Sequence, residues 1–300
     1  MVRPIGVRRS RRCGACRGRV AEATWTAAPG LAPAEPSWRQ RGALWCLSPR
    51  PGSLRGLIEF IGGSYLAATP QVSYRRLLEA LSALGWQIHA WSYVPGFDHQ
   101  LQANEAWRLF RQERQRWLES HSMDVSRQCR PTAGLEAGAS RGAGPAVLRL
   151  GHSLGCKLHL LAPDAGRGCD GLAALAFNNF SAERSVPLLA EVGQQFGFRS
   201  EFSPSPAETL RLVSGQYRQP RNLLVRFDRD GLDQSGRLLA ALRQRSEDAS
   251  QLLELPGDHL TPASAGLRRR LLGEWADDPS RQRQVDGLAR RIEAWWERSP

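Results

Sequence analysis

The stretch Ala146-Val147-Leu148-Arg149-Leu150-Gly151-His152-Ser153-Leu154-Gly155 decides the fold. Its first five residues are apolar except for Arg149 and predict a buried strand, and residues 154–162 have the apolar spacing of a helix. Between them lies the pattern G-x-S-x-G, in which a serine occupies a strained turn between a strand and a helix. The glycines avoid a clash with the backbone that crosses there. The sequence therefore predicts a nucleophile elbow that exposes Ser153 at the carboxyl end of a strand.

Strands and helices alternate on both sides of this turn. Periodicity and turn residues predict strands at 44–47, 54–61, 87–93, 146–150, 172–177, 223–227 and 251–255. They predict helices at 70–84, 103–118, 154–162, 232–245 and 281–298, with an irregular helical stretch at 181–217 and a polar loop at 121–145. Such alternation is typical of an α/β fold with a mostly parallel, doubly wound sheet that is covered by helices on both faces.

A serine hydroxyl becomes a nucleophile only when a base takes its proton and an acid orients that base. In this arrangement the partners follow in the order serine, acid, histidine, each just beyond a strand. His259 follows the final predicted strand, and three aspartates follow the strand before it. We predict the set Ser153, His259 and Asp230, with Asp233 as the alternative acid and Asp228 third. Capping of the helix near Leu232 is the competing role for these aspartates, and a position in a surface loop is the competing role for His259.

The reaction also needs two N–H groups that hold a negatively charged oxygen. We expect one from the backbone of Leu154, directly after the nucleophile. The other is expected from Gly63 or Ser64, which follow an early strand, although a simple tight turn also explains these residues. Asn178 and Asn179 follow another strand end and are expected either to line the substrate pocket or to form an ordinary turn.

The cysteines do not predict a metal site or a disulfide framework. Cys13 and Cys16 have C-x-x-C spacing, but no second pair or H-x-x-x-H follows to complete a zinc site. We therefore expect no metal and no cofactor. No secretory signal is evident, so a reducing compartment is the default.

The net charge of +12 at first suggests nucleic acid as a partner. Residues 1–36, however, hold seven arginines against two glutamates, and Lys157 is the only lysine in the chain. Such a bias toward arginine is typical of a GC-rich genome, so we expect a solvated basic surface without specific nucleic-acid binding. Residues 1–36 are expected to be a disordered extension, a transit peptide or the product of a start codon placed too far upstream, ahead of one domain at 37–300. No apolar run is long enough to cross a bilayer.

Several motifs between Trp38 and Pro262 resemble those of an uncharacterised family of α/β-hydrolase-like proteins, a domain of unknown function found in cyanobacteria and plant plastids. These motifs are Phe60-Ile61-Gly62-Gly63-Ser64, Thr69-Pro70-Gln71-Val72-Ser73-Tyr74-Arg75, Phe97-Asp98-His99, Gly151-His152-Ser153-Leu154-Gly155, Phe177-Asn178-Asn179-Phe180, Asp230-Gly231-Leu232-Asp233-Gln234 and Gly257-Asp258-His259-Leu260-Thr261-Pro262. The resemblance implies an α/β-hydrolase fold, a photosynthetic source, and a place in the cyanobacterial cytoplasm or a plastid, without secretion. It also places residues 1–36 outside the family domain and supplies no substrate.

Two hypotheses of different classes follow. The first is a serine hydrolase that cleaves an ester or thioester of a small molecule or acyl lipid. Residues 181–217 would form its lid, and peripheral contact with a membrane is compatible with it. The second is a non-catalytic binding or assembly factor with the same fold. The distinguishing observation is whether a carboxylate reaches His259 and His259 reaches Ser153.

Overall fold

The computed structural model describes residues 37–64, 66–128, 144–181, 201–263 and 279–298, with only the backbone described at 121–128. Eight strands form one sheet in the order β1-β2-β4-β3-β5-β6-β7-β8. Their bounds are β1 Arg39–Arg41, β2 Leu44–Leu47, β3 Gly56–Ile61, β4 Trp86–Trp91, β5 Ala146–His152, β6 Gly171–Leu175, β7 Asn222–Phe227 and β8 Gln251–Leu255. The neighbouring strands β4, β3, β5, β6, β7 and β8 pair in parallel. Strand β2 pairs antiparallel with both β1 and β4.

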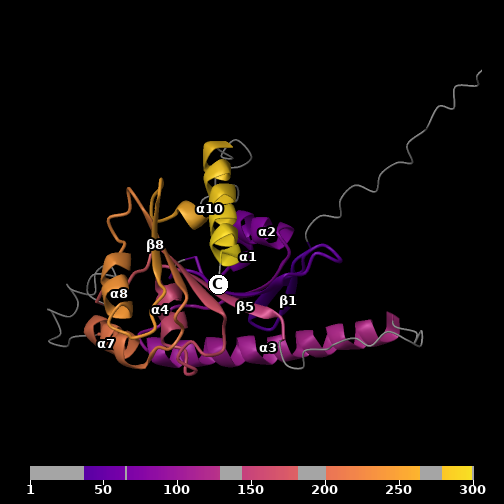
Figure 1. Cartoon of the computed structure of the whole chain (residues 1–300), viewed down its shortest axis with the longest axis horizontal. Helices are drawn as coiled ribbons and strands as arrows, with labels where there is room; N and C mark the ends of the chain where they lie inside the picture. The colour runs from indigo at the N-terminus through magenta and orange to yellow at the C-terminus, as the bar shows by residue number, and fades with distance from the viewer. Residues whose placement is uncertain (1–36, 65, 129–143, 182–200, 264–278, 299–300) are drawn as a thin grey trace, which may run out of the picture. The chain divides into compact units, whose positions relative to one another are not determined.

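Helices cover both faces of the sheet (Figure 1). On one face, α1 (Pro70–Ser73), α2 (Arg75–Ala83) and α10 (Pro279–Glu297) pack over a core that includes Leu81 and Ile292. On the other face lie α3 (His99–Gln128), α4 (Leu154–Leu160), α7 (Pro206–Gln216) and α8 (Ser235–Leu242). Burial on both faces explains why β3, β4 and β6 are buried along their whole length. The predicted α/β-hydrolase architecture, with its doubly wound and mostly parallel sheet, is confirmed.

The sequence misplaced some element boundaries. The helix predicted at 103–118 begins at His99 and continues to Gln128, because residues 119–128 hold no glycine or proline to end it. The helix predicted at 70–84 is divided at Tyr74 into α1 and α2. The short edge strand β1 was not predicted at all.

Some expectations lie outside the described residues. They concern residues 1–36 with Cys13 and Cys16, most of the predicted loop at 121–145, and residues 182–200 of the predicted lid. The described part of that lid contains α7.

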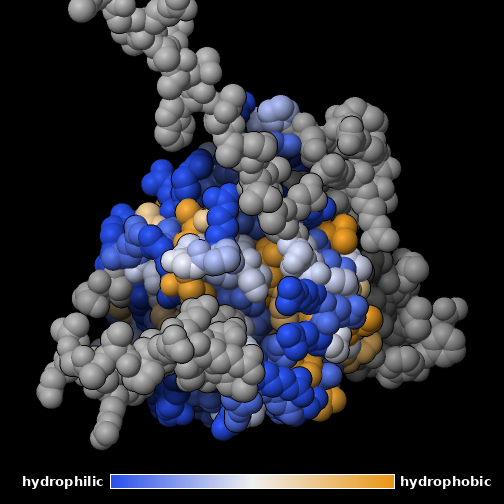
Figure 2. Space-filling view, turned by 90° about the vertical axis from the view of Figure 1, so that its right-hand side faces the viewer, coloured by the Kyte–Doolittle hydropathy of each residue, from blue (hydrophilic) through white to orange (hydrophobic). Residues whose placement is uncertain are grey.

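The described helices include none with the length and apolar character to cross a membrane. On the face shown in Figure 2, hydrophilic side chains predominate and apolar ones form small, separate patches. That face therefore resembles an ordinary solvated surface.

Candidate active site

The turn at Ser153 has the strained geometry that its sequence pattern predicts. Ser153 has φ 55° and ψ −120°, between the end of β5 and the start of α4. A Cβ atom at Gly155 would lie 2.0 Å from the carbonyl oxygen of Ile61, and one at Gly151 would lie 2.6 Å from the backbone nitrogen of Cys156. Both positions therefore exclude any side chain, and the tight crossing presents Ser153 beside the end of β3.

The structure brings Ser153, His259 and Asp230 into one hydrogen-bonded chain. His259 Nε2 lies 3.0 Å from Ser153 Oγ, and His259 Nδ1 lies 2.8 Å from Asp230 Oδ2. The Asp230 side chain is fully buried, and its Oδ1 accepts a hydrogen bond from the N–H of Leu232. Burial alone would raise the pKa of Asp230, but the hydrogen bonds from His259 and Leu232 outweigh it and hold the pKa below its usual value. The acid therefore stays ionised beside the imidazole.

The two other candidate acids make different contacts. The Asp233 carboxylate accepts hydrogen bonds from the N–H and the hydroxyl of Ser235, the first residue of α8. Burial raises the pKa of Asp233. Asp228 Oδ1 accepts from the N–H of Gly257. Neither carboxylate is bonded to His259. Asp233 holds Ser235 at the start of α8, but the N-cap of that helix is Gln234, which makes no side-chain cap bond.

The expected oxyanion donors differ in availability. The N–H groups of Leu154 and Ser64 have no hydrogen-bond partner among the described residues. The N–H of Gly63, in contrast, donates to Tyr74 Oη at 2.8 Å. A Cβ at Gly63 would lie 3.0 Å from the Cβ of Ser153, so this loop closely approaches Ser153. Of the two early-strand candidates, only Ser64 thus has a free N–H.

Sequence reasoning missed a second buried chain of hydrogen bonds behind the serine. His152 Nδ1 lies 2.8 Å from Tyr74 Oη, and His152 Nε2 lies 2.8 Å from the carbonyl oxygen of His259. Burial lowers the pKa of His152 to about 3, so its ring is neutral. Because a carbonyl oxygen can only accept, His152 donates from Nε2 and accepts the Tyr74 hydroxyl at Nδ1. The sequence hint was the placement of both residues in the motifs that carry the family resemblance.

A cavity of about 1030 Å³ opens above Ser153. Apolar residues form much of its wall, including Leu66, Val94, Phe97, Phe180, Phe202, Leu232 and Leu260. Asn178 and Asn179 both line it, as expected. Asn179 donates from Nδ2 to the carbonyl oxygen of Pro206, and Asn178 Oδ1 accepts from the N–H of Phe180. Each asparagine therefore also holds the local backbone.

Comparisons with known proteins agree with this fold. A family model described as "Protein of unknown function (DUF1350)" matches residues 37–277. A solved structure described as "Putative hydrolase from Agrobacterium vitis S4" is 12% identical, with a TM-score of 0.53, and the match covers 87% of this chain and 97% of that chain. An α/β serine hydrolase homologue from Coxiella burnetii is 14% identical, with a TM-score of 0.49, over 87% and 98% of the two chains. No curated protein matches the chain in sequence. At these identities the structural likeness shows the fold and no more.

Proposed function

The chain belongs to the family described as Protein of unknown function (DUF1350), and we propose that it is a serine hydrolase that cleaves an ester or thioester. The observation that carries the proposal is the unbroken contact from Asp230 through His259 to Ser153. It occurs at the carboxyl ends of parallel strands, where α/β folds bind their ligands.

The contacts assign a role to each group. Asp230 accepts the Nδ1 proton of His259, which leaves the Nε2 lone pair directed at the serine hydroxyl. His259 takes the hydroxyl proton as Ser153 Oγ attacks the carbonyl carbon. The N–H groups of Leu154 and Ser64 hold the resulting oxyanion. His259 then protonates the leaving alcohol or thiol. A water gives a proton to His259 as it attacks the acyl group on Ser153, and His259 passes that proton to Ser153 Oγ as the acid leaves.

His152 and Tyr74 act as positioning residues in this proposal. Neutral His152 donates a hydrogen bond to the backbone carbonyl of His259. The Tyr74 hydroxyl donates to His152 and accepts from the N–H of Gly63. The loop that carries the base is thereby tied to the loop that carries Ser64. The link fixes the base and the oxyanion donor relative to the nucleophile without either side chain reacting.

The cavity wall favours an apolar acyl group. Val94, Phe97, Leu232 and Leu260 are large apolar residues that remain exposed at the cavity. Burial of an acyl chain against them would remove apolar surface from water on both partners. An acyl-lipid ester fits this wall, and α7 with the preceding segment provides the described part of a lid.

The alternative of a non-catalytic assembly factor rested on the ambiguous acid. Asp230 lies within hydrogen-bond distance of His259, and Asp233 is bonded to Ser235 instead. These contacts favour Asp230 as the acid and support the hydrolase over the alternative. The basic charge likewise supports no nucleic-acid proposal, because no base-reading or phosphate-binding motif accompanies it.

A fluorophosphonate probe tests the proposal directly, because it reacts only with an activated serine. We expect the wild-type protein to be labelled at one site and Ser153→Ala to lose all labelling. Ser214→Ala is the matched control, because Ser214 lies exposed on α7 and donates only to a backbone carbonyl. It should be labelled like the wild type. Absence of labelling in folded wild-type protein, or equal labelling of Ser153→Ala, would refute the proposal.

A further inference from the structure

The cavity beside Ser153 contains the only lysine of the chain. Arginine supplies every other one of the 41 lysine and arginine residues. Lys157 lies one helical turn after Ser153 on α4, lines the cavity and is only 1% exposed. A compact ammonium thus occupies a buried position in a chain whose other basic side chains, apart from histidine, are all guanidinium groups. This contrast suggests a specific role for Lys157.

The donors of Lys157 are incompletely used. Its Nζ donates to the carbonyl oxygen of Pro204 at 3.0 Å and lies 5.8 Å from the centre of the Phe202 ring. Within the described ranges, no carboxylate lies at ion-pair distance from it. An ammonium has three N–H donors, and a buried cation is costly unless it is paired. Two donors therefore remain for a group that enters the cavity.

His99 provides a second unsatisfied group in the same cavity. It lies at the start of α3 and is 2% exposed, and neither ring nitrogen has a hydrogen-bond partner. Its ring packs 4.2 Å from that of Phe202, the ring that Lys157 also approaches. Burial lowers the pKa of His99 to about 3, so it is neutral and can donate one N–H. Buried polar groups normally have partners, so these unpaired nitrogens also point to a ligand.

We propose that Lys157 and His99 bind an anionic oxygen group, a carboxylate or a phosphate, carried by the substrate whose ester or thioester Ser153 attacks. This inference rests on the proposed serine hydrolase and narrows its substrate to amphipathic acyl compounds. The apolar wall receives the chain, and the ammonium neutralises a charge that the substrate carries into the same cavity. Pairing with the anion also satisfies donors that are otherwise buried without partners.

The charge of Lys157 gives the preference a pH dependence. Burial lowers the pKa of Lys157 to about 8, partly opposed by Glu201 and by Glu208 of α7, while neutral His99 faces it from α3. The ammonium is charged below that pKa and neutral above it. The preference for anionic substrates should therefore weaken as the pH rises through about 8.

The test compares 4-nitrophenyl esters of equal length that end in a carboxylate, a phosphate or a methyl group. We expect the wild type to prefer one of the anionic esters, and Lys157→Met to reduce kcat/KM for that ester about 10- to 100-fold while changing the methyl ester little. Arg237→Met removes an exposed cation of α8 that does not line the cavity, and it is the matched control that should preserve the preference. Equal losses on anionic and methyl esters in Lys157→Met would assign it a structural role only and overturn the inference.

A binding measurement separates this inference from the proposed function. Ser153→Ala protein is titrated with glutarate and with inorganic phosphate by calorimetry, which needs no catalysis. Binding of either anion that Lys157→Met abolishes supports the subsite and identifies its chemistry, whereas absence of binding by both overturns it. Failure of the wild type to hydrolyse any ester would instead count against the serine hydrolase.

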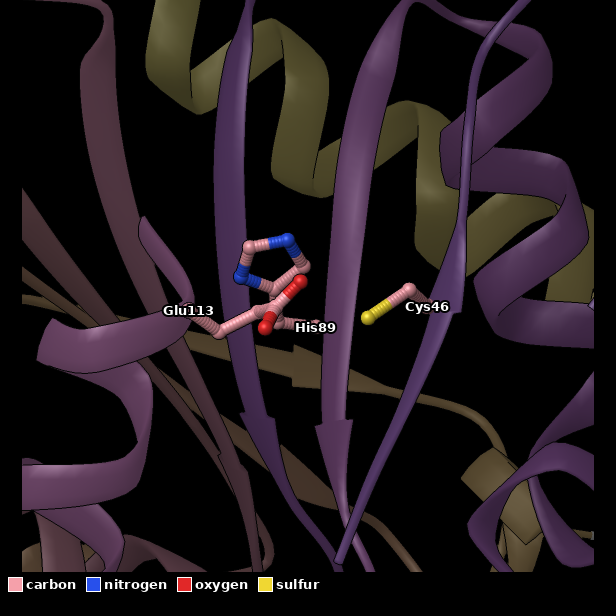
Figure 3. Close-up of side chains that lie close together, drawn as sticks. All are labelled: Cys46, His89 and Glu113. Carbon is pink, nitrogen blue, oxygen red and sulfur yellow. The ribbon is translucent and has the colours of Figure 1, made fainter. Parts of the chain in front are cut away.

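A separate cluster of side chains lies between the sheet and α3. Cys46 on β2 and His89 on β4 are direct partners across the antiparallel ladder and share one face. Glu113 reaches them from α3, and Figure 3 shows its carboxylate and the Cys46 thiol beside the His89 ring. One ligand atom from each residue lies within 4.8 Å of the others, and all three residues are buried.

His89 belongs to a buried polar row, and both of its ring nitrogens lack a hydrogen-bond partner within the described part of the chain. Its neighbour in register, Glu59, pairs with Arg149, and Arg149 forms a two-pronged bond with Asp164. His89 itself is 1% exposed, and neither of its ring nitrogens has a partner. An imidazole buried this way loses its hydration without a compensating hydrogen bond, which is costly.

From this different observation we infer that Cys46, His89 and Glu113 bind a divalent metal ion of the zinc type. Thiolate, imidazole and carboxylate are the ligands of zinc in proteins, and three of them leave a fourth position for water. The two anionic ligands balance the charge of the ion. Arg41 and Arg116 both pair with Glu113 now, but their side chains are more than half exposed and can turn to solvent. The ion would join β2, β4 and α3 as a structural brace.

The experiment uses the full chain with Cys13, Cys16 and Cys129 replaced by serine, so that no thiol from those positions competes. After treatment with a chelator, we expect one equivalent of Zn²⁺ to bind by calorimetry and to raise Tm. Cys46→Ser and His89→Gln should each weaken binding at least about 10-fold, and Co²⁺ should show a thiolate charge-transfer band that Cys46→Ser removes. Cys169→Ser is the control, because this buried thiol lies outside the cluster. Absence of stoichiometric binding, or equal weakening in the control, would overturn the inference.

Discussion

Replacement of Asp230 by asparagine is expected to lower kcat/KM for ester hydrolysis on the order of 10⁴-fold while the protein remains folded. The asparagine side chain has nearly the same size, but its amide donates where the carboxylate accepts. His259 would then turn its Nδ1 lone pair toward residue 230 and its Nε2 proton toward Ser153. A base in that tautomer cannot take the hydroxyl proton, so the loss falls on the chemical step and appears in kcat.

Asp233→Asn is the matched control, because both aspartates lie in the same loop. Asp233 is bonded to Ser235 at the start of α8 and has no bond to His259. The side-chain oxygen of asparagine can still accept from Ser235, so this replacement should change stability little and leave kcat near the wild-type value. Steady-state kinetics measures kcat of both variants, and circular dichroism checks that both are folded. A larger loss of kcat in Asp233→Asn than in Asp230→Asn would assign the acid to Asp233 and refute the proposed triad.

The choice between these two acids shows where sequence reasoning ends. Strand ends place both aspartates and His259 at the same edge of the sheet, because carboxyl ends of parallel strands share an edge. The pattern thus placed both candidates in one loop and ranked Asp230 first, and Asp230 is the one that bonds to His259 in the structure. It did not determine which carboxylate turns inward, because this depends on local backbone geometry such as the Asp230 bond to the N–H of Leu232.

Contacts between side chains of different helices and strands could not be predicted from the sequence for a related reason. Cys46 and His89 are 43 positions apart and meet through strand register, which apolar periodicity does not specify for an individual pair. Tyr74 lies at the break between α1 and α2, a boundary that periodicity merged into one helix. Its contact with His152 depends on that break, so neither the positioning pair nor the metal-type cluster was predicted. Lys157, in contrast, stood out in composition before its place in the cavity was known.

Gly155→Ala is expected to destabilise the protein by at least about 3 kcal/mol, which lowers Tm by roughly 6–12 °C in a domain of this size. Its Cβ would lie 2.0 Å from the backbone oxygen of Ile61, which belongs to β3 in the middle of the sheet and cannot move aside as a flexible side chain can. Gly287→Ala is the matched control, because Gly287 lies within α10 and nothing lies within 4 Å of its Cβ position. That change should stabilise the helix by about 0.5–1 kcal/mol. Thermal and denaturant unfolding of the two variants gives the comparison.

The same crossing explains why the loss of stability should extend to the active site. The close approach of α4 to the end of β3 is also what places the loop of Gly63 and Ser64 against Ser153. A methyl group at position 155 would push these elements apart and move the free N–H of Ser64 away from the developing oxyanion, so kcat should fall even below the melting transition. If Gly155→Ala instead unfolds like Gly287→Ala and retains full activity, the crossing is looser than the backbone geometry indicates, and the oxyanion role of Ser64 loses its structural basis.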